Sequence, residues 1–293
     1  MALGIDLIKP DFVGQVTGVD LSRPLTAAQV GAIRSWIDHY AVLVFRDQIL
    51  TDEQQLAFTR NFGEIESAYG NKLPGNAQEN RLGLGMIDVS NLATDGDPLD
   101  LDSRTRLFNM GNMLWHSDSS YKATPAKYSL LSARIVNPTG GNTEFADMRS
   151  AYDALEDDIR IEIDELICEH SQMYSRGSLG LLDYSEEEKV ILRPVRQRLV
   201  RVHPVTGRKS LYLSAHAGGI IGMPAPQARI ILKDLNEHAT RPEFVYVHKW
   251  RTNDLVMWDN RQTMHRVRRY DESRPRDMRR TTVAGDCMTT AQA

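Results

Sequence analysis

The chain has 293 residues, of which 41% are hydrophobic and 25% are charged, as in ordinary globular proteins. Its formal net charge of −4 argues against a dedicated nucleic-acid-binding protein, and apolar runs such as AVLVF are too short to span a bilayer. The N-terminus lacks the basic region and apolar core of a signal peptide, and the two cysteines form no close-spaced motif. We therefore expect a cytoplasmic protein with no nucleic-acid or membrane partner, and a single domain over residues 1–293.

The N-terminal part of the sequence alternates between helix and strand patterns. A helix is expected over residues 26–40, where apolar residues recur on one face, and a buried strand over 41–47. A second helix is expected over 50–63, with Thr51 as its N-cap and Gln54 three residues later. These elements predict helices that pack against a sheet.

Residues 67–108 are polar and weakly periodic, which indicates a long loop of the kind that lines active sites. The sequence after this loop is dominated by short strands with turn signals, a pattern that favours an antiparallel sandwich or barrel. The strands are expected at 112–118, 128–136, 143–148, 199–204, 210–215, 244–250, 254–260 and 279–286. Helical inserts are expected at 147–166 and 224–240, and an irregular insert at 171–197. We predict an α+β fold with a double-stranded β-helix (jelly-roll, cupin-like) core and flanking helices.

Two histidines and an aspartate form a candidate metal site. In the stretch LWHSDSSY, His116 and Asp118 are two residues apart, which on a strand places both side chains on one face. The stretch DLVMWDNRQTMHR supplies His265 on a second, distant strand. Two histidines and one carboxylate that leave other positions open are the ligand set of non-haem iron(II) oxygenases.

Arg276 and Arg280 follow the distal histidine. A planar, permanently charged guanidinium can hold the free end of a dicarboxylic co-substrate whose other end chelates iron. The stretch GGNTEF could add the hydroxyl group of Thr143, and Gly140 and Gly141 would allow a close approach of the backbone.

Taken together, these motifs give a specific resemblance. The stretches LWHSDSSY, GGNTEFADMRSAYDAL, EHATRPEFVYVHKW, DLVMWDNRQTMHR and RRYDESRPRDMRRTT resemble iron(II)/2-oxoglutarate-dependent dioxygenases of the taurine dioxygenase group, and within it the 2,4-dichlorophenoxyacetate dioxygenases. The resemblance implies Fe(II), 2-oxoglutarate and O₂, with activity supported by ascorbate. It also implies a small anionic substrate: an aryloxyacetate hydroxylated next to its ether oxygen, which yields a phenol and glyoxylate together with succinate and CO₂, as in herbicide catabolism.

The resemblance also implies a role for individual residues. It assigns the metal and the catalytic centre to His116, Asp118 and His265. It assigns 2-oxoglutarate binding to Thr143, Arg276 and Arg280. The residues that it places on the substrate side are Lys72, Asn112, Ser119, His216 and Arg280.

Several alternatives stay open at this point. The same chemistry could act on a sulfonate such as taurine, an alkyl sulfate or another carboxylic acid. A non-catalytic cupin-like metal-binding protein would explain the ligands but not the spacing of Thr143, Arg276 and Arg280. A zinc hydrolase would need a general base at motif spacing. An iron halogenase would carry a small residue in place of Asp118. The sequence leaves the natural substrate, its chirality and a homo-oligomeric state open.

Overall fold

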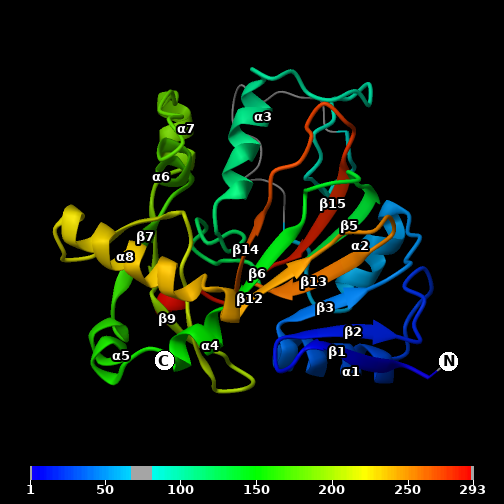
Figure 1. Cartoon of the computed structure of the whole chain (residues 1–293), viewed down its shortest axis with the longest axis horizontal. Coiled ribbons are helices and arrows are strands. Elements are labelled where there is room, and N and C mark those ends of the chain that lie inside the picture. The colour runs from blue at the N-terminus through cyan, green and yellow to red at the C-terminus, as the bar shows by residue number, and fades with distance from the viewer. Residues whose placement is uncertain (1, 67–80, 292–293) are drawn as a thin grey trace.

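The computed structural model describes residues 2–66 and 81–291, and its main element is a seven-stranded sheet in the order β1-β2-β3-β13-β5-β15-β4 (Figure 1). Its strands are β1 (Gly4–Lys9), β2 (Val13–Thr17), β3 (Val42–Phe45), β13 (Leu255–Asp259), β5 (Tyr128–Ile135), β15 (Asp277–Val283) and β4 (Ile87–Asp88). Only the β2–β3 pair among these strands is parallel. Strands from both ends of the chain therefore lie side by side in one sheet.

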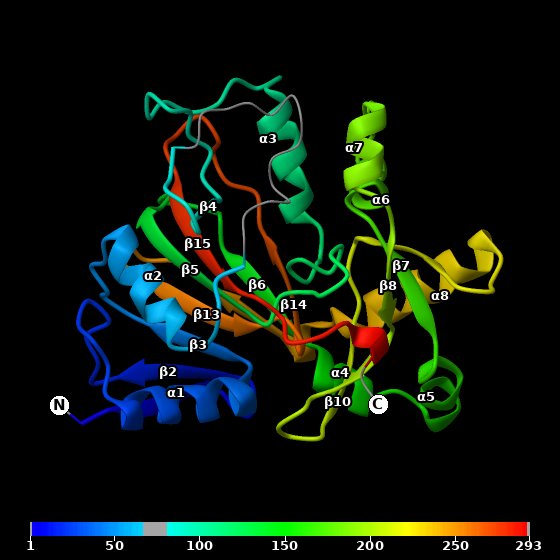
Figure 2. The ribbon, with the colours of Figure 1, turned by 180° about the vertical axis from the view of Figure 1, so that it is seen from behind.

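The two faces of this sheet bury different cores because successive side chains of a strand point in opposite directions. On β3, Leu43 and Phe45 belong to an apolar cluster with residues of the helices α1 (Ala27–Tyr40) and α2 (Asp52–Arg60). Figure 2 shows both helices beside the strands of this sheet. Val42 and Val44 belong to a second apolar cluster on the other face.

Both N-terminal helices begin where the sequence predicts. Thr26 and Thr51 are their N-caps, and each forms a capping box with a glutamine three residues later. The reciprocal hydrogen bonds satisfy backbone donors that the first turn leaves free. The predicted cap at Thr51 with Gln54 is thus confirmed.

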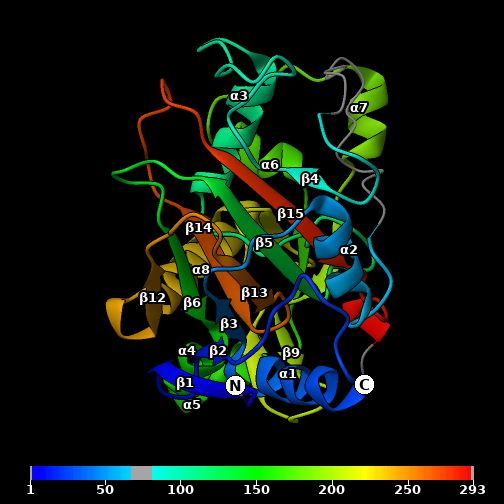
Figure 3. The ribbon, with the colours of Figure 1, turned by 90° about the vertical axis from the view of Figure 1, so that its right-hand side faces the viewer.

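A three-stranded sheet faces the large one, in the order β12 (Val245–His248), β6 (Thr143–Asp147), β14 (Thr263–Val267). Phe145 of this sheet packs against Trp258 of β13, with ring centroids 5.5 Å apart. The second apolar cluster therefore fills the space between the two sheets, and the site described below lies at its edge. Figure 3 shows the strands of both sheets from the side.

The third part of the fold is built on a further apolar cluster. Its strands are β7 (Ile167–His170), β8 (Val195–Arg198), β9 (Val200–Val202), β10 (Lys209–Leu211) and β11 (Ala217–Ile220). Its helices are α4 (Met148–Asp153), α5 (Asp157–Ile163) and α8 (Ala225–Ala239). The helices α3 (Arg104–Asn109), α6 (Gln172–Gly177) and α7 (Glu186–Ile191) project on one side of the molecule (Figure 1). Short 3-10 helices complete the list: η2 (Met110–Met113), η3 (Pro242–Phe244) and η4 (Thr289–Ala291).

The mixed α+β class is confirmed, but some expected elements are wrong. The expected strand at 112–118 is instead the end of η2 followed by a single β-bridge at His116. A longer strand cannot form because the chain turns at once, with Ser119 at a φ of 56°. The insert at 171–197 contains α6, α7 and β8 rather than irregular chain, and β4 and α3 lie in the described part of the expected 67–108 loop.

No helix in residues 2–66 or 81–291 is both long enough and apolar enough to cross a membrane.

Candidate active site

His116, Asp118 and His265 come together between the two facing sheets. A two-way pair of backbone hydrogen bonds (3.0 and 2.8 Å) joins His116 to His265 on β14. His116 Nε2 lies 3.9 Å from Asp118 Oδ1, and His265 Nε2 lies 3.8 Å from Asp118 Oδ2. The three side chains are 6%, 3% and 7% exposed. One ligand atom from each lies within 4.8 Å of the others, a spacing that suits a shared metal ion.

Strand alternation explains why His265 and Thr143 face the same space. Met264 packs into the apolar cluster that contains residues of α4 and α8, so its neighbour His265 points to the opposite face of the small sheet, toward the large sheet. His265 pairs directly with Phe145 on β6, and Thr143 is two residues from Phe145 on the same face. The register of the small sheet thus places a metal ligand and a hydroxyl donor on one inner face.

The large sheet contributes two side chains to Asp118. Ser129 of β5 donates its hydroxyl hydrogen to Asp118 Oδ2 at 2.7 Å. Arg280 of β15, on the same face as the core residue Met278, contacts Asp118 Oδ1 through Nη1. Both partners bind the ionised carboxylate and therefore hold it in place.

The donor geometry and charge state of the three residues fit a divalent metal ion. The Leu114 carbonyl can only accept, so His116 donates from Nδ1 at 2.7 Å and keeps Nε2 free as a ligand. Burial alone would raise the pKa of Asp118, but Arg280 and the two histidines lower it to about 2. Burial lowers the pKa of His116 and places that of His265 well below its usual value. Two neutral imidazoles and one carboxylate are the protonation states that metal ligation requires.

A second cluster of two aspartates and a histidine does not suit a metal ion. Asp38, His203 and Asp259 are also buried together, but the Arg261 guanidinium lies between the carboxylates. Arg261 Nη2 is 2.9 Å from Asp38 Oδ1 and 2.7 Å from Asp259 Oδ2. A cation already occupies this cluster, so we interpret it as a structural ion network.

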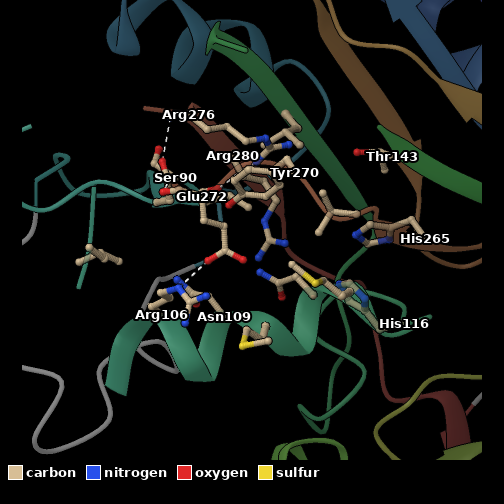
Figure 4. A pocket seen from close by; sticks show the side chains of 18 of the residues that line it. Ser90, Arg106, Asn109, His116, Thr143, His265, Tyr270, Glu272, Arg276 and Arg280 are labelled. Carbon is tan, nitrogen blue, oxygen red and sulfur yellow. Dashed lines mark hydrogen bonds and ion pairs between the residues drawn. The ribbon is translucent and has the colours of Figure 1, made fainter. Parts of the chain in front are cut away.

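A cavity extends from His116 and His265 to Arg276 (Figure 4). The predicted residues Thr143, Arg280 and Asn112 line it as well. Further lining residues that the sequence analysis did not single out include Arg106, Asn109, Tyr270 and Glu272. In Figure 4, α3 supplies Arg106 on one wall, and a dashed line joins Arg106 to Glu272. The cavity is thus polar at the end away from the histidines.

Arg276 presents a buried positive charge to this cavity. Its guanidinium makes only long hydrogen bonds of 3.4 Å, to the carbonyls of Val89 and Gly141, and stacks 5.0 Å from the centre of the Tyr270 ring. Burial lowers its pKa, and none of the described carboxylates lies within ion-pair distance. The close backbone approach predicted at Gly140 is confirmed, because a Cβ at this position would lie only 2.4 Å from the Arg269 carbonyl oxygen.

Thr143 is oriented by a residue that the sequence analysis did not identify. Trp250 donates its indole N–H to Thr143 Oγ1 at 2.9 Å. Indole N–H groups only donate, so the hydroxyl oxygen is the acceptor and its own hydrogen is left for another partner.

The substrate-side candidates are placed differently from one another. The His216 ring lies 6.1 Å from that of His116, and its Nδ1 is 2.9 Å from Ser175 Oγ. Ser119 donates to Glu66 Oε2 at 2.8 Å, so its hydroxyl group is already engaged. Lys72 lies outside the described residues.

Comparison with known proteins agrees with this geometry. Residues 5–282 match the model of the family described as taurine catabolism dioxygenase TauD, TfdA family. The chain belongs to this family. It is 44% identical over 286 residues to the alpha-ketoglutarate-dependent 2,4-dichlorophenoxyacetate dioxygenase of Burkholderia sp. (strain RASC), covering 97% of this chain and 95% of that one. It is 37% identical over 298 residues to the (S)-phenoxypropionate/alpha-ketoglutarate-dioxygenase of Sphingobium herbicidovorans, covering 97% and 96%.

A solved structure has a sequence that is more similar still. The crystal structure of AAD-2 in complex with Mn(II) and N-oxalylglycine superposes with a TM-score of 0.96 at 63% identity, covering 99% of this chain and 100% of that one. As a member of the TauD, TfdA family, this chain is a 2-oxoglutarate-dependent dioxygenase.

Besides the lining residues named above, sequence reasoning missed Ser129 and Trp250, which contact Asp118 and Thr143. Their roles depend on contacts with distant parts of the chain, so no local pattern assigns them to the site.

Proposed function

We propose that this dioxygenase hydroxylates an aryloxyacetate such as 2,4-dichlorophenoxyacetate at the carbon next to the ether oxygen. The observation that carries the proposal is the His116, Asp118 and His265 cluster at one end of a cavity whose other end holds the unpaired guanidinium of Arg276. A dicarboxylate can span such a cavity, with one end at a metal and the other at an arginine.

The residues have distinct roles in this proposal. His116, Asp118 and His265 would hold Fe(II), which would supply the oxidation that couples decarboxylation of 2-oxoglutarate to hydroxylation. Thr143 and Arg276 bind the distal carboxylate of 2-oxoglutarate. Arg280 keeps Asp118 ionised and positioned, and contributes positive charge toward the proximal carboxylate.

The protein provides geometry and exclusion of water rather than the oxidation itself. The ligands are buried, and the rings of Trp258 and Phe145 cover His265 at 4.7 and 6.0 Å between ring centres. His216, Asn112 and Arg280 are the described residues that we assign to the organic substrate, with Ser119 as a supporting residue and Lys72 as a further candidate.

The instability of the hydroxylated product explains how the ether carbon–oxygen bond is cleaved. Hydroxylation of the methylene group gives a hemiacetal, which collapses to a phenol and glyoxylate. The co-substrate leaves as succinate and CO₂.

The arrangement of the strands supports a proposal about the fold. The facing β5/β13/β15 and β6/β12/β14 strands support a double-stranded β-helix (jelly-roll) core. We propose that the chain forms a single dioxygenase domain.

The test is product analysis with Fe(II), 2-oxoglutarate and ascorbate. We expect 2,4-dichlorophenol and glyoxylate from 2,4-dichlorophenoxyacetate, in step with succinate. Taurine and an alkyl sulfate serve as competing substrates. Sulfite release from taurine without phenol formation would overturn the aryloxyacetate proposal and leave the dioxygenase chemistry standing.

A further inference from the structure

Arg176, on α6, shares an unusual environment with Arg276. Each guanidinium is buried, with 4% of the residue exposed. In the described chain, neither has a carboxylate within ion-pair distance, whereas the buried Arg149 pairs with Asp147 at 2.8 Å. A buried charge without a counter-ion is costly, so it indicates a place that an anion fills.

The contacts of Arg176 leave its charge uncompensated. The guanidinium lies over the Phe108 ring, 4.5 Å from the centroid, and its Nε donates to the Phe108 carbonyl at 3.1 Å. Its Nη1 donates to Ser175 Oγ at 3.1 Å. All of these partners are neutral. Burial lowers the pKa of Arg176, but a guanidinium keeps its proton in proteins.

Gly111 allows this guanidinium to lie against the segment that leads into the metal-ligand motif. A Cβ on Gly111 would lie only 2.3 Å from Arg176 Cζ. Gly111 belongs to η2, five residues before His116. The chain therefore keeps a side-chain-free position at the point where Arg176 meets the active-site segment.

A chain of contacts joins Arg176 to the His216 side of the metal cluster. Ser175 Oγ bonds both Arg176 and His216 Nδ1, and the His216 ring lies 6.1 Å from His116 and 5.0 Å from Tyr121. Arg276 lies on the other side, in the cavity lined by Thr143, where Arg176 is not a lining residue.

We infer that Arg176 binds the carboxylate of the organic substrate and selects anionic substrates over neutral ones. This inference rests on the proposed function, in which two anions enter the site. Arg276 serves 2-oxoglutarate, and the charge of Arg280 is compensated by Asp118. The substrate carboxylate is bonded to the carbon that is hydroxylated, so it must lie close to His116, which is the side where Arg176 is found.

The experiment compares binding of 2,4-dichlorophenoxyacetate with binding of the neutral 2,4-dichlorophenoxyacetamide. Calorimetry on protein loaded with Mn(II) and N-oxalylglycine gives both dissociation constants without turnover. We expect Arg176→Met to weaken binding of the acid about 10- to 100-fold and to leave binding of the amide nearly unchanged. Arg176→Lys should fall between, because it keeps the charge but loses the fork.

A second variant guards against simple misfolding of the Arg176→Met protein. Gly111→Ala keeps the arginine but displaces its guanidinium, so it should lose the same preference for the acid. The matched control is Arg193→Met, which removes the same charge from an exposed position in the same part of the chain. This control should bind both ligands like the wild type, and all variants should retain affinity for N-oxalylglycine.

The outcomes separate this inference from the proposed function. If the wild type turns over the acid, and Arg176→Met and Gly111→Ala still bind the acid in preference to the amide, the role of Arg176 alone is overturned. Equal weakening of acid and amide binding also overturns it, because that pattern indicates a structural role. If the wild type binds the acid but does not turn it over, and Arg176→Met loses this binding, only the proposed function is overturned. If the wild type does not bind the acid at all, both are overturned.

Discussion

The hydrogen bond from Trp250 to Thr143 predicts that Trp250, which does not line the cavity of Figure 4, affects the affinity for 2-oxoglutarate. Trp250→Phe keeps an aromatic ring but removes the indole N–H that bonds Thr143 Oγ1 at 2.9 Å. Without this donor the threonine hydroxyl can rotate and accept from other groups, so its hydrogen is no longer directed at the 2-oxoglutarate carboxylate.

The expected effect is that of one neutral hydrogen bond. Such a bond contributes about 0.5–1.5 kcal/mol, which corresponds to a rise of about 2- to 13-fold in the dissociation constant for 2-oxoglutarate. Calorimetry with Mn(II) in place of iron measures this constant. The turnover number at saturating 2-oxoglutarate should change little.

A double-mutant cycle distinguishes this coupling from a loss of packing. Thr143→Val removes the hydroxyl group, so adding Trp250→Phe to it should have no further effect on co-substrate affinity. Trp250 also packs 4.5 Å from the His248 ring, and a packing defect would persist in the Thr143→Val background. Additive effects of the two substitutions would refute the proposed orientation of Thr143.

Further predictions concern the co-substrate, the metal and the fold. Arg276→Lys keeps the charge but loses the bidentate fork, so the dissociation constant for 2-oxoglutarate should rise about 10- to 100-fold, and an unchanged value would place the distal carboxylate elsewhere. Asp118→Ala should abolish metal binding and turnover while the far-ultraviolet circular dichroism stays unchanged; near-normal activity would contradict the ligand assignment. Because burial lowers the pKa of His116 and His265, protons compete less with the metal there than at a free imidazole, so Mn(II) affinity should fall less between pH 7 and pH 6 than that of free imidazole, and an equal fall would contradict this reasoning. Asp259→Asn leaves a buried guanidinium with one carboxylate fewer and should lower the free energy of unfolding by about 3–5 kcal/mol in urea titrations, whereas a loss below about 1 kcal/mol would show that the ion network is dispensable.

The sequence by itself determined the local structure and the chemical type of the site. The capping boxes at Thr26 and Thr51 depend on residues three positions apart, and such local hydrogen bonds form wherever the helix begins. The residue types of His116, Asp118 and His265 were sufficient to indicate a metal site with open positions. The downstream Thr143, Arg276 and Arg280 then favoured iron(II) with 2-oxoglutarate over the other metal sites.

Only the tertiary structure decided how these residues meet. The expected strand through His116 is a single bridge, yet the backbone pairing with His265 still brings the two ligands together. The inward direction of Thr143 depends on its register with β14, and a shift of one residue would turn it outward.

The charge balance of the site was also beyond the reach of the sequence. All arginines carry the same charge in a sequence, but Arg280 is compensated by Asp118, while Arg176 and Arg276 are buried among neutral groups. Whether a charge is available to a ligand depends on which distant side chains fold against it. Local patterns contain no record of those contacts, so the lack of a carboxylate partner at Arg176 and Arg276 became visible only in the folded chain.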